Sequence, residues 1–191
     1  NMTQEAGIDN QRWGASAAFV DYDRDGWLDL YVTNYVDFLP ATVCRTRDGR
    51  IDYCSPSAFE GTLHQLYHNV TGQQTGGAGA VRFEDVSASS GVARRRGSGL
   101  GIAVAYVDED DWPDIFVSND GNANFMWINN RDGTFRDDAI MLGSAYDSQG
   151  RSQANMGVAV DDIDGDGRQD FFITHLAGES NAMFMGESTS G

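Results

Sequence analysis

The chain has 191 residues, of which 40% are apolar and 11% aromatic, so it can form a packed core and is not a disordered acidic tail. Its 13 basic and 29 acidic residues give a formal net charge of -16, which argues against nucleic acid and anionic membrane surfaces as partners. No run of about 18 apolar residues occurs, so we expect no transmembrane helix and no direct membrane insertion.

Short apolar runs recur along the chain in a fixed order. The first set predicts strands at 14–20, 30–34, 66–69 and 82–86. The second set lies at 99–105, 115–119, 126–129 and 134–137, and a third at 156–160, 171–174 and 183–186. Four short strands per repeat, joined by tight turns, are typical of a propeller blade. We therefore predict an all-β fold, a β-propeller of four-stranded antiparallel blades, here a partial propeller of about three blades.

The repeat divides residues 1–191 into parts of a single propeller segment. Residues 1–8 match 85–92 and are expected to be the tail of a preceding blade. The blades are predicted at 14–90 with an insertion at 35–63, at 99–140, and at 155–191, the last incomplete. Propellers close with about four to eight blades, so the remaining blades or a larger assembly are needed to complete this one.

The loop between the first two predicted strands is dense in carboxylates. Asp21, Asp23 and Asp25 alternate, Gly26 permits a tight turn, and Asp29 follows at the ninth position. Alternating carboxylates that would otherwise repel one another are typical of a loop that wraps a hard cation such as Ca²⁺. Trp27, at the seventh position, would contribute only its backbone carbonyl. A solvated acidic turn is the alternative.

The same spacing returns in the third repeat and in altered form in the second. The third loop carries Asp162, Asp164, Asp166 and Asp170, with Arg168 at the position of the backbone ligand. The second loop keeps Asp108, Asp110 and Asp114 but has Tyr106 at the first ligand position, so we expect weaker metal binding there, or none. The loops are not EF-hands, because their twelfth positions hold Val32 and Ile173 in place of a bidentate glutamate. The sequence thus predicts two Ca²⁺ sites and a doubtful third.

The insertion at 35–63 is longer than a hairpin loop and carries both cysteines, Cys44 and Cys54. Two cysteines are too few for a zinc site, so we expect a local disulfide, with two free thiols as the alternative. Loops of this size on a rigid scaffold often bind partners. An insertion without a binding role, closed by its disulfide, fits the sequence equally well.

Catalytic motifs are missing from the sequence. It contains no GxSxG, HExxH or phosphate-binding glycine motif, and the dense acidic clusters are better explained by metal coordination than by glycosidic acid–base chemistry. The three histidines, His64, His68 and His175, are expected at the surface. We therefore expect that this chain is not an enzyme.

Several of these motifs together resemble a known family. The loops at 21–29 and 162–170, the runs 99–105 and 130–135, and the segment 34–38 before the cysteine insertion resemble FG-GAP/VCBS repeats of integrin-alpha-type propellers, and most closely the cartilage acidic protein family. The resemblance implies a secreted, periplasmic or cell-surface protein whose calcium loops are structural. It favours a non-enzymatic scaffold or a subunit of a larger complex, with a protein or glycan partner. The alternatives are the propeller portion of an extracellular carbohydrate-active enzyme and an integrin-like adhesion module.

Overall fold

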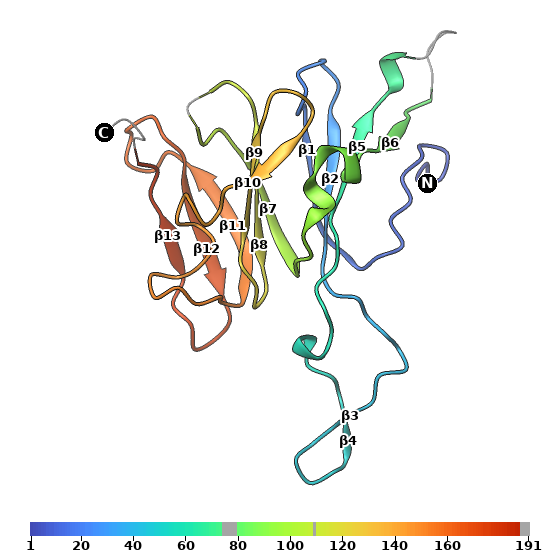
Figure 1. Cartoon of the computed structure of the whole chain (residues 1–191), viewed down its shortest axis with the longest axis vertical. Coiled ribbons are helices and arrows are strands. Elements are labelled where there is room, and N and C mark those ends of the chain that lie inside the picture. The colour runs from blue at the N-terminus through green and yellow to red at the C-terminus, as the bar shows by residue number, and fades with distance from the viewer. Residues whose placement is uncertain (74–79, 109, 188–191) are drawn as a thin grey trace.

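The computed structural model describes residues 1–73, 80–108 and 110–187. Within these ranges the chain is all-β, with antiparallel strands in three larger sheets and one small hairpin. The larger sheets lie side by side in chain order (Figure 1). The predicted all-β fold with antiparallel sheets is confirmed.

The first two sheets each have four strands in sequence order. The first contains β1 (Gly14–Val20), β2 (Asp29–Asn34), β5 (Gln65–Asn69) and β6 (Phe83–Asp85). The second contains β7 (Gly99–Ala105), β8 (Asp114–Asn119), β9 (Phe125–Asn129) and β10 (Phe135–Asp137). Their boundaries lie within about one residue of the predicted ones, because each apolar run ends where an acidic loop or a glycine turn begins.

The third sheet has three strands in the described residues, β11 (Asn155–Asp161), β12 (Asp170–His175) and β13 (Ala182–Phe184). The sequence predicts a third strand that extends to Gly186, but β13 ends two residues earlier. In the first two sheets the corresponding residues, Asn69 and Asn129, pair with a fourth strand. No fourth strand is described here to hold Met185 and Gly186 in a ladder.

The insertion forms a separate arm that projects away from the sheets (Figure 1). It contains the hairpin β3 (Cys44–Arg45) and β4 (Ile51–Asp52) and the short helix η1 (Pro56–Ala58). Cys44 and Cys54 form a disulfide, which confirms the predicted pairing. The disulfide closes a loop too small to have a core of its own.

The other helices are single turns in connections: η2 (Thr71–Gln73), α1 (Ser87–Ser90) and η3 (Val92–Arg94). Among the described residues, no helix has the length and apolar character needed to cross a membrane. Residues 1–8 form turns, and the backbone oxygen of Ala6 accepts the N–H of Phe83 in β6 at 2.7 Å.

Two layers of apolar side chains join the three sheets. Tyr31, Leu66, Ile115 and Trp127 pack between the first and second sheets. Phe116, Met126, Phe171 and Ile173 pack between the second and third. The middle sheet is therefore covered on both faces, and every residue of β8 is buried.

The two outer sheets each leave one face uncovered. Along β1 and β12 successive side chains point to opposite faces, so Phe19 and Phe172 point away from the middle sheet. Phe19 is 62% exposed and Phe172 39% exposed. Residues 1–8 cover only part of the first of these faces, around Tyr67 and Phe83.

The first strands of the second and third sheets approach each other closely at Gly101. A Cβ atom there would lie 2.4 Å from Ser118 Oγ and 2.6 Å from the backbone oxygen of Met156 in β11. Ser118 Oγ donates a hydrogen bond to that same oxygen at 2.7 Å. Gly101 is thus required by packing between sheets.

We predict that Gly101→Ala lowers the free energy of unfolding by about 1–3 kcal/mol, because the added methyl must displace a backbone atom in a packed interface. Urea denaturation followed by tryptophan fluorescence measures the change. Gly157→Ala is the matched control: Gly157 occupies the same position of β11, but the nearest atom to its Cβ would be Thr174 Oγ1 at 3.4 Å. Equal losses in the two variants would contradict the packing argument.

Candidate metal centres

A buried aspartate begins the second strand of each sheet: Asp29 in β2, Asp114 in β8 and Asp170 in β12. Each carboxylate accepts two backbone N–H bonds, one from the second residue of its loop and one from the last residue of the third strand or, for Asp170, from a residue just after that strand. For Asp29 the donors are Tyr22 at 3.2 Å and Asn69 at 2.7 Å. For Asp114 they are Val107 and Asn129, both at 2.9 Å, and for Asp170 they are Ile163 at 3.0 Å and Gly186 at 2.8 Å.

Burial makes the charged form of these carboxylates less favourable. It raises the pKa of Asp29 to about 6, while the N–H bonds from Asn69 and Tyr22 act in the opposite direction. Burial likewise raises the pKa of Asp114 to about 6, against the N–H bonds from Asn129 and Val107. Each of these carboxylates therefore gains from any nearby positive charge.

In the first loop the three alternating acids converge. Asp21, Asp23 and Asp25 each offer an oxygen, and these atoms lie within 4.8 Å of one another. Asp21 Oδ2 accepts the N–H of Gly26 at 3.1 Å, whereas its Oδ1 is buried with no hydrogen-bond partner among the described residues. The predicted ligand Trp27 keeps its side chain half exposed, against Gly72.

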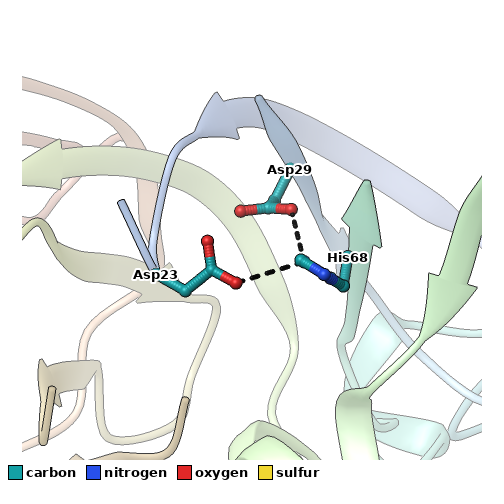
Figure 2. A group of neighbouring side chains, drawn as sticks. All are labelled: Asp23, Asp29 and His68. Carbon is teal, nitrogen blue, oxygen red and sulfur yellow. Dashed lines mark hydrogen bonds and ion pairs between the residues drawn. The ribbon is translucent and has the colours of Figure 1, made fainter. Parts of the chain in front are cut away.

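A second group in the same region brings in a histidine. Asp23, Asp29 and His68 of β5 offer ligand atoms within 4.8 Å of one another. Figure 2 shows both carboxylates pointing toward the imidazole. His68 Nδ1 lies 3.0 Å from Asp29 Oδ1 and 3.4 Å from Asp23 Oδ2.

The third loop gathers a different subset of its acids. Asp162, Asp164 and Asp170 place their ligand atoms within 4.8 Å of one another. Asp162 accepts the N–H groups of Gly165 and Gly167 at 2.8 and 2.9 Å. The predicted ligand Asp166 is outside this group, and its Oδ2 forms an ion pair with Arg168 Nη1 at 2.9 Å.

The second loop does not gather its acids into such a group within the described residues. Instead, Arg131 contacts Asp110 through Nε at 2.6 Å and Nη2 at 2.5 Å, and Arg136 lies 3.8 Å from Asp108. Tyr106, at the first ligand position, is half exposed and donates its N–H to Gln169 Oε1 at 2.6 Å. Arginines from outside the second loop thus supply positive charge to its acids.

The donors of the first and third loops fit a hard divalent cation. They are carboxylate oxygens, the ligands that Ca²⁺ prefers, and the buried Asp21 Oδ1 lacks a partner that an ion would provide. Acidic residues of both outer loops can therefore hold a metal ion.

The histidine prediction was wrong for two of the three side chains. His64 is only 1% exposed and lies between the first two sheets, with Nδ1 3.2 Å from the hydroxyl of Tyr31. The side chain of His68 is 14% exposed. The pairing of the two predicted strands could have placed His68. Leu30 of β2 pairs with Tyr67 of β5, so the next residue of β5 lies beside Asp29.

Comparison with known proteins identifies a repeat family and similar curated proteins. Residues 106–173 match the model of a repeat family described as the FG-GAP-like repeat. Cartilage acidic protein 1 of Xenopus tropicalis is 27% identical over 187 residues, 97% of this chain and 24% of the relative. Cartilage acidic protein 1 of Homo sapiens is 32% identical over 113 residues, 59% of this chain and 16% of the relative. The predicted resemblance is confirmed, and the chain spans about a quarter or less of the length of these curated relatives.

The buried His64 makes stability depend on pH. Burial lowers its pKa from 6.5 to about 4, so the unfolded chain takes up the proton first as the pH falls. The contribution of the neutral His64 side chain to the free energy of unfolding is complete above pH 6.5 and is lost as the pH drops through about 4. Relative to His64→Gln, which cannot be protonated there, we predict that the wild type loses about 3 kcal/mol of unfolding free energy between pH 7 and pH 4.

Urea denaturation at a series of pH values measures this difference. His175→Gln is the control, because it also removes a histidine but from the edge of β12, where its Nε2 lies 2.7 Å from Asn155. Parallel pH profiles for the wild type and His64→Gln would contradict the prediction.

Proposed function

We propose that this chain is a non-enzymatic, calcium-stabilised β-propeller segment that serves as an extracytoplasmic interaction scaffold or as a subunit of a larger complex. The observation that carries the proposal is the convergence of carboxylates in the loops at 21–29 and 162–170, each joining the first two strands of a sheet. The ligands are Asp21, Asp23, Asp25 and Asp29 with the Trp27 carbonyl, and Asp162, Asp164, Asp166 and Asp170 with the Arg168 carbonyl.

The three sheets are interpreted as successive blades at 14–90, 99–140 and 155–191, although residues 188–191 lie outside the described part of the chain. Their first strands, β1, β7 and β11, would line the propeller axis. Support comes from the close approach of β7 and β11 at Gly101 and from the face-to-face packing of the sheets.

Residues 1–8 are interpreted as the end of a further blade, because they repeat the corner that follows β6. Ala6 donates its N–H to the oxygen of Met2 at 2.7 Å, and Ser90, its counterpart, to that of Val86 at 2.8 Å. The glycines that follow, Gly7 and Gly91, both have positive φ angles of 79° and 91°. A corner of this kind is expected where one blade passes to the next.

Further blades, or a partner that replaces them, would cover the two open faces. Phe19 and Phe172 lie on those faces as exposed aromatic side chains that a neighbouring sheet would bury. Gly157 repeats the small residue at Gly101 but has no neighbouring strand against it in the described chain. A fourth blade packed on β11 as β11 packs on β7 would use that space.

Calcium would act by linkage between binding and folding. An ion that binds only the folded loops stabilises them by about 2.7 kcal/mol when its free concentration is a hundred times Kd. It would also offset the repulsion among the carboxylates of each loop. In the second loop Arg131 and Arg136 perform that role, so the proposal gives two ions per chain and leaves Asp108, Asp110 and Asp114 without one.

An extracytoplasmic location is supported by the Cys44–Cys54 disulfide, since disulfides persist in oxidising compartments. The insertion that carries it is the proposed site for a protein or glycan partner. It lies on an arm away from the sheets, where a partner can reach it (Figure 1).

A second candidate, a carbohydrate-active propeller, has one observation in its favour. A hollow beside the insertion is lined by Tyr35, Phe59, Glu60 and Asp120, two aromatic rings and two carboxylates outside the metal loops. Asp120 Oδ2 already accepts the hydroxyl hydrogen of Tyr35. Turnover of a glycan by the purified chain, lost on Glu60→Gln, would favour this candidate over the scaffold.

We predict that Ca²⁺ raises the melting temperature, that EDTA reverses the rise, and that elemental analysis finds two ions per chain. Asp162→Asn with Asp164→Asn should remove one ion and reduce the Ca²⁺-induced rise. Without Ca²⁺, Asp164→Asn alone should melt higher than the wild type, because it removes a like charge and leaves both oxygens of Asp162 to accept the loop N–H groups. Asp48→Asn, in the exposed hairpin, is the control. No bound metal together with no shift on EDTA would overturn the proposal.

A further inference from the structure

The first loop has a donor set that the other loops lack. Asp23 comes from the loop, Asp29 from the start of β2 and His68 from β5, and the three side chains meet at one point (Figure 2). Asp29 is fully buried, whereas Asp23 keeps 28% of its side chain exposed. The group is therefore held by the sheet and still open to solvent on the loop side.

The imidazole nitrogen changes which ions the group suits. Ca²⁺ is bound almost entirely by oxygen atoms, whereas Zn²⁺ and similar transition ions bind imidazole nitrogen together with carboxylate oxygen. Ligands around a tetrahedral ion with bonds of about 2.0 Å lie about 3.3 Å apart. His68 Nδ1 lies 3.0 and 3.4 Å from the two carboxylate oxygens, close to that spacing.

The equivalent positions in the other sheets carry no such donor. His68 precedes Asn69, whose N–H binds the buried Asp29. The residues that precede Asn129 and Gly186, which bind Asp114 and Asp170 in the same way, are Ile128 and Met185. The group in the third loop consists only of oxygen donors, so the chain contains its own reference site.

We propose that Asp23, Asp29 and His68 form a binding site for a transition divalent cation of the Zn²⁺ class, distinct in ion preference from the third loop. Binding uses the lone pair of Nδ1, so a proton on that nitrogen is released or moves to Nε2. This site shares Asp23 and Asp29 with the proposed calcium site of the first loop. A Zn²⁺ ion therefore competes with Ca²⁺ for the first loop only, a consequence that rests on the proposed calcium function.

The test begins with the whole chain stripped of metal by a chelator and dialysed. Isothermal titration with Zn²⁺ measures affinity and stoichiometry, and Co²⁺ serves as a spectroscopic probe whose visible absorption reports a nitrogen-containing site. We expect one Zn²⁺ site, weakened at least about tenfold by His68→Met, which introduces the residue found at the equivalent position of the third sheet, Met185. His175→Met, which removes a histidine outside any acidic group, should bind Zn²⁺ like the wild type.

A second measurement uses the unmodified protein, so that a misfolded variant cannot decide the result. The ¹⁵N resonance of His68 Nδ1 should move to the position of a metal-bound imidazole nitrogen on addition of Zn²⁺, whereas Ca²⁺, which would bind the neighbouring carboxylates, should not produce that signal. Unchanged Zn²⁺ affinity in a folded His68→Met variant, or no Zn²⁺-dependent shift of that resonance, would overturn the proposal. Ca²⁺ titrations of the same samples test the calcium function separately: failure to bind Ca²⁺ would remove only the competition and leave the Zn²⁺ site standing.

Discussion

The arrangement of each sheet depends on a single buried aspartate at the start of its second strand. A carboxylate removed from water is costly unless its oxygens accept hydrogen bonds. Asp29, Asp114 and Asp170 meet that requirement with one N–H from the preceding loop and one from the end of the third strand or, for Asp170, from Gly186 just beyond it. The same side chain thus sets the curl of the loop and ties it to a strand that lies further along the chain. Loop geometry and sheet register are consequences of one charged group.

The second loop shows that the closing aspartate can keep this structural role without a group of metal-ligating acids beside it among the described residues. Asp114 makes the same two bonds as its counterparts, although Tyr106 replaces the first acid and the remaining acids contact arginines. A closing aspartate therefore suffices to shape the loop when the chain itself neutralises the other charges. The first and third loops have four acids each and, unlike the second loop as far as the structure describes it, bring groups of three metal-ligating side chains together within 4.8 Å. The acids beyond the closing aspartate are the groups that can hold an external cation.

Local sequence signals predicted most of the fold. Apolar runs bounded by acidic loops and glycines set the strands, and the Cys44–Cys54 pair lies close enough in sequence to close a small loop. The errors concern contacts made by folding. His64 and His68 were placed at the surface because nothing in their local sequence indicates that β5 is a central strand of its sheet, where polar side chains face a core or a loop.

The acidic loops and the insertion at 35–63 lie at opposite ends of the sheets. Each acidic loop joins a first strand to a second, so all three loops lie at the end where β2, β8 and β12 begin. The insertion leaves β2 at its other end, after Asn34, and projects from there (Figure 1). An ion in the first loop therefore has no direct contact with a partner on the insertion. It can influence that partner only by stiffening β2, the strand the two regions share, so metal binding should alter partner affinity through the stability of this sheet and not through the binding surface itself.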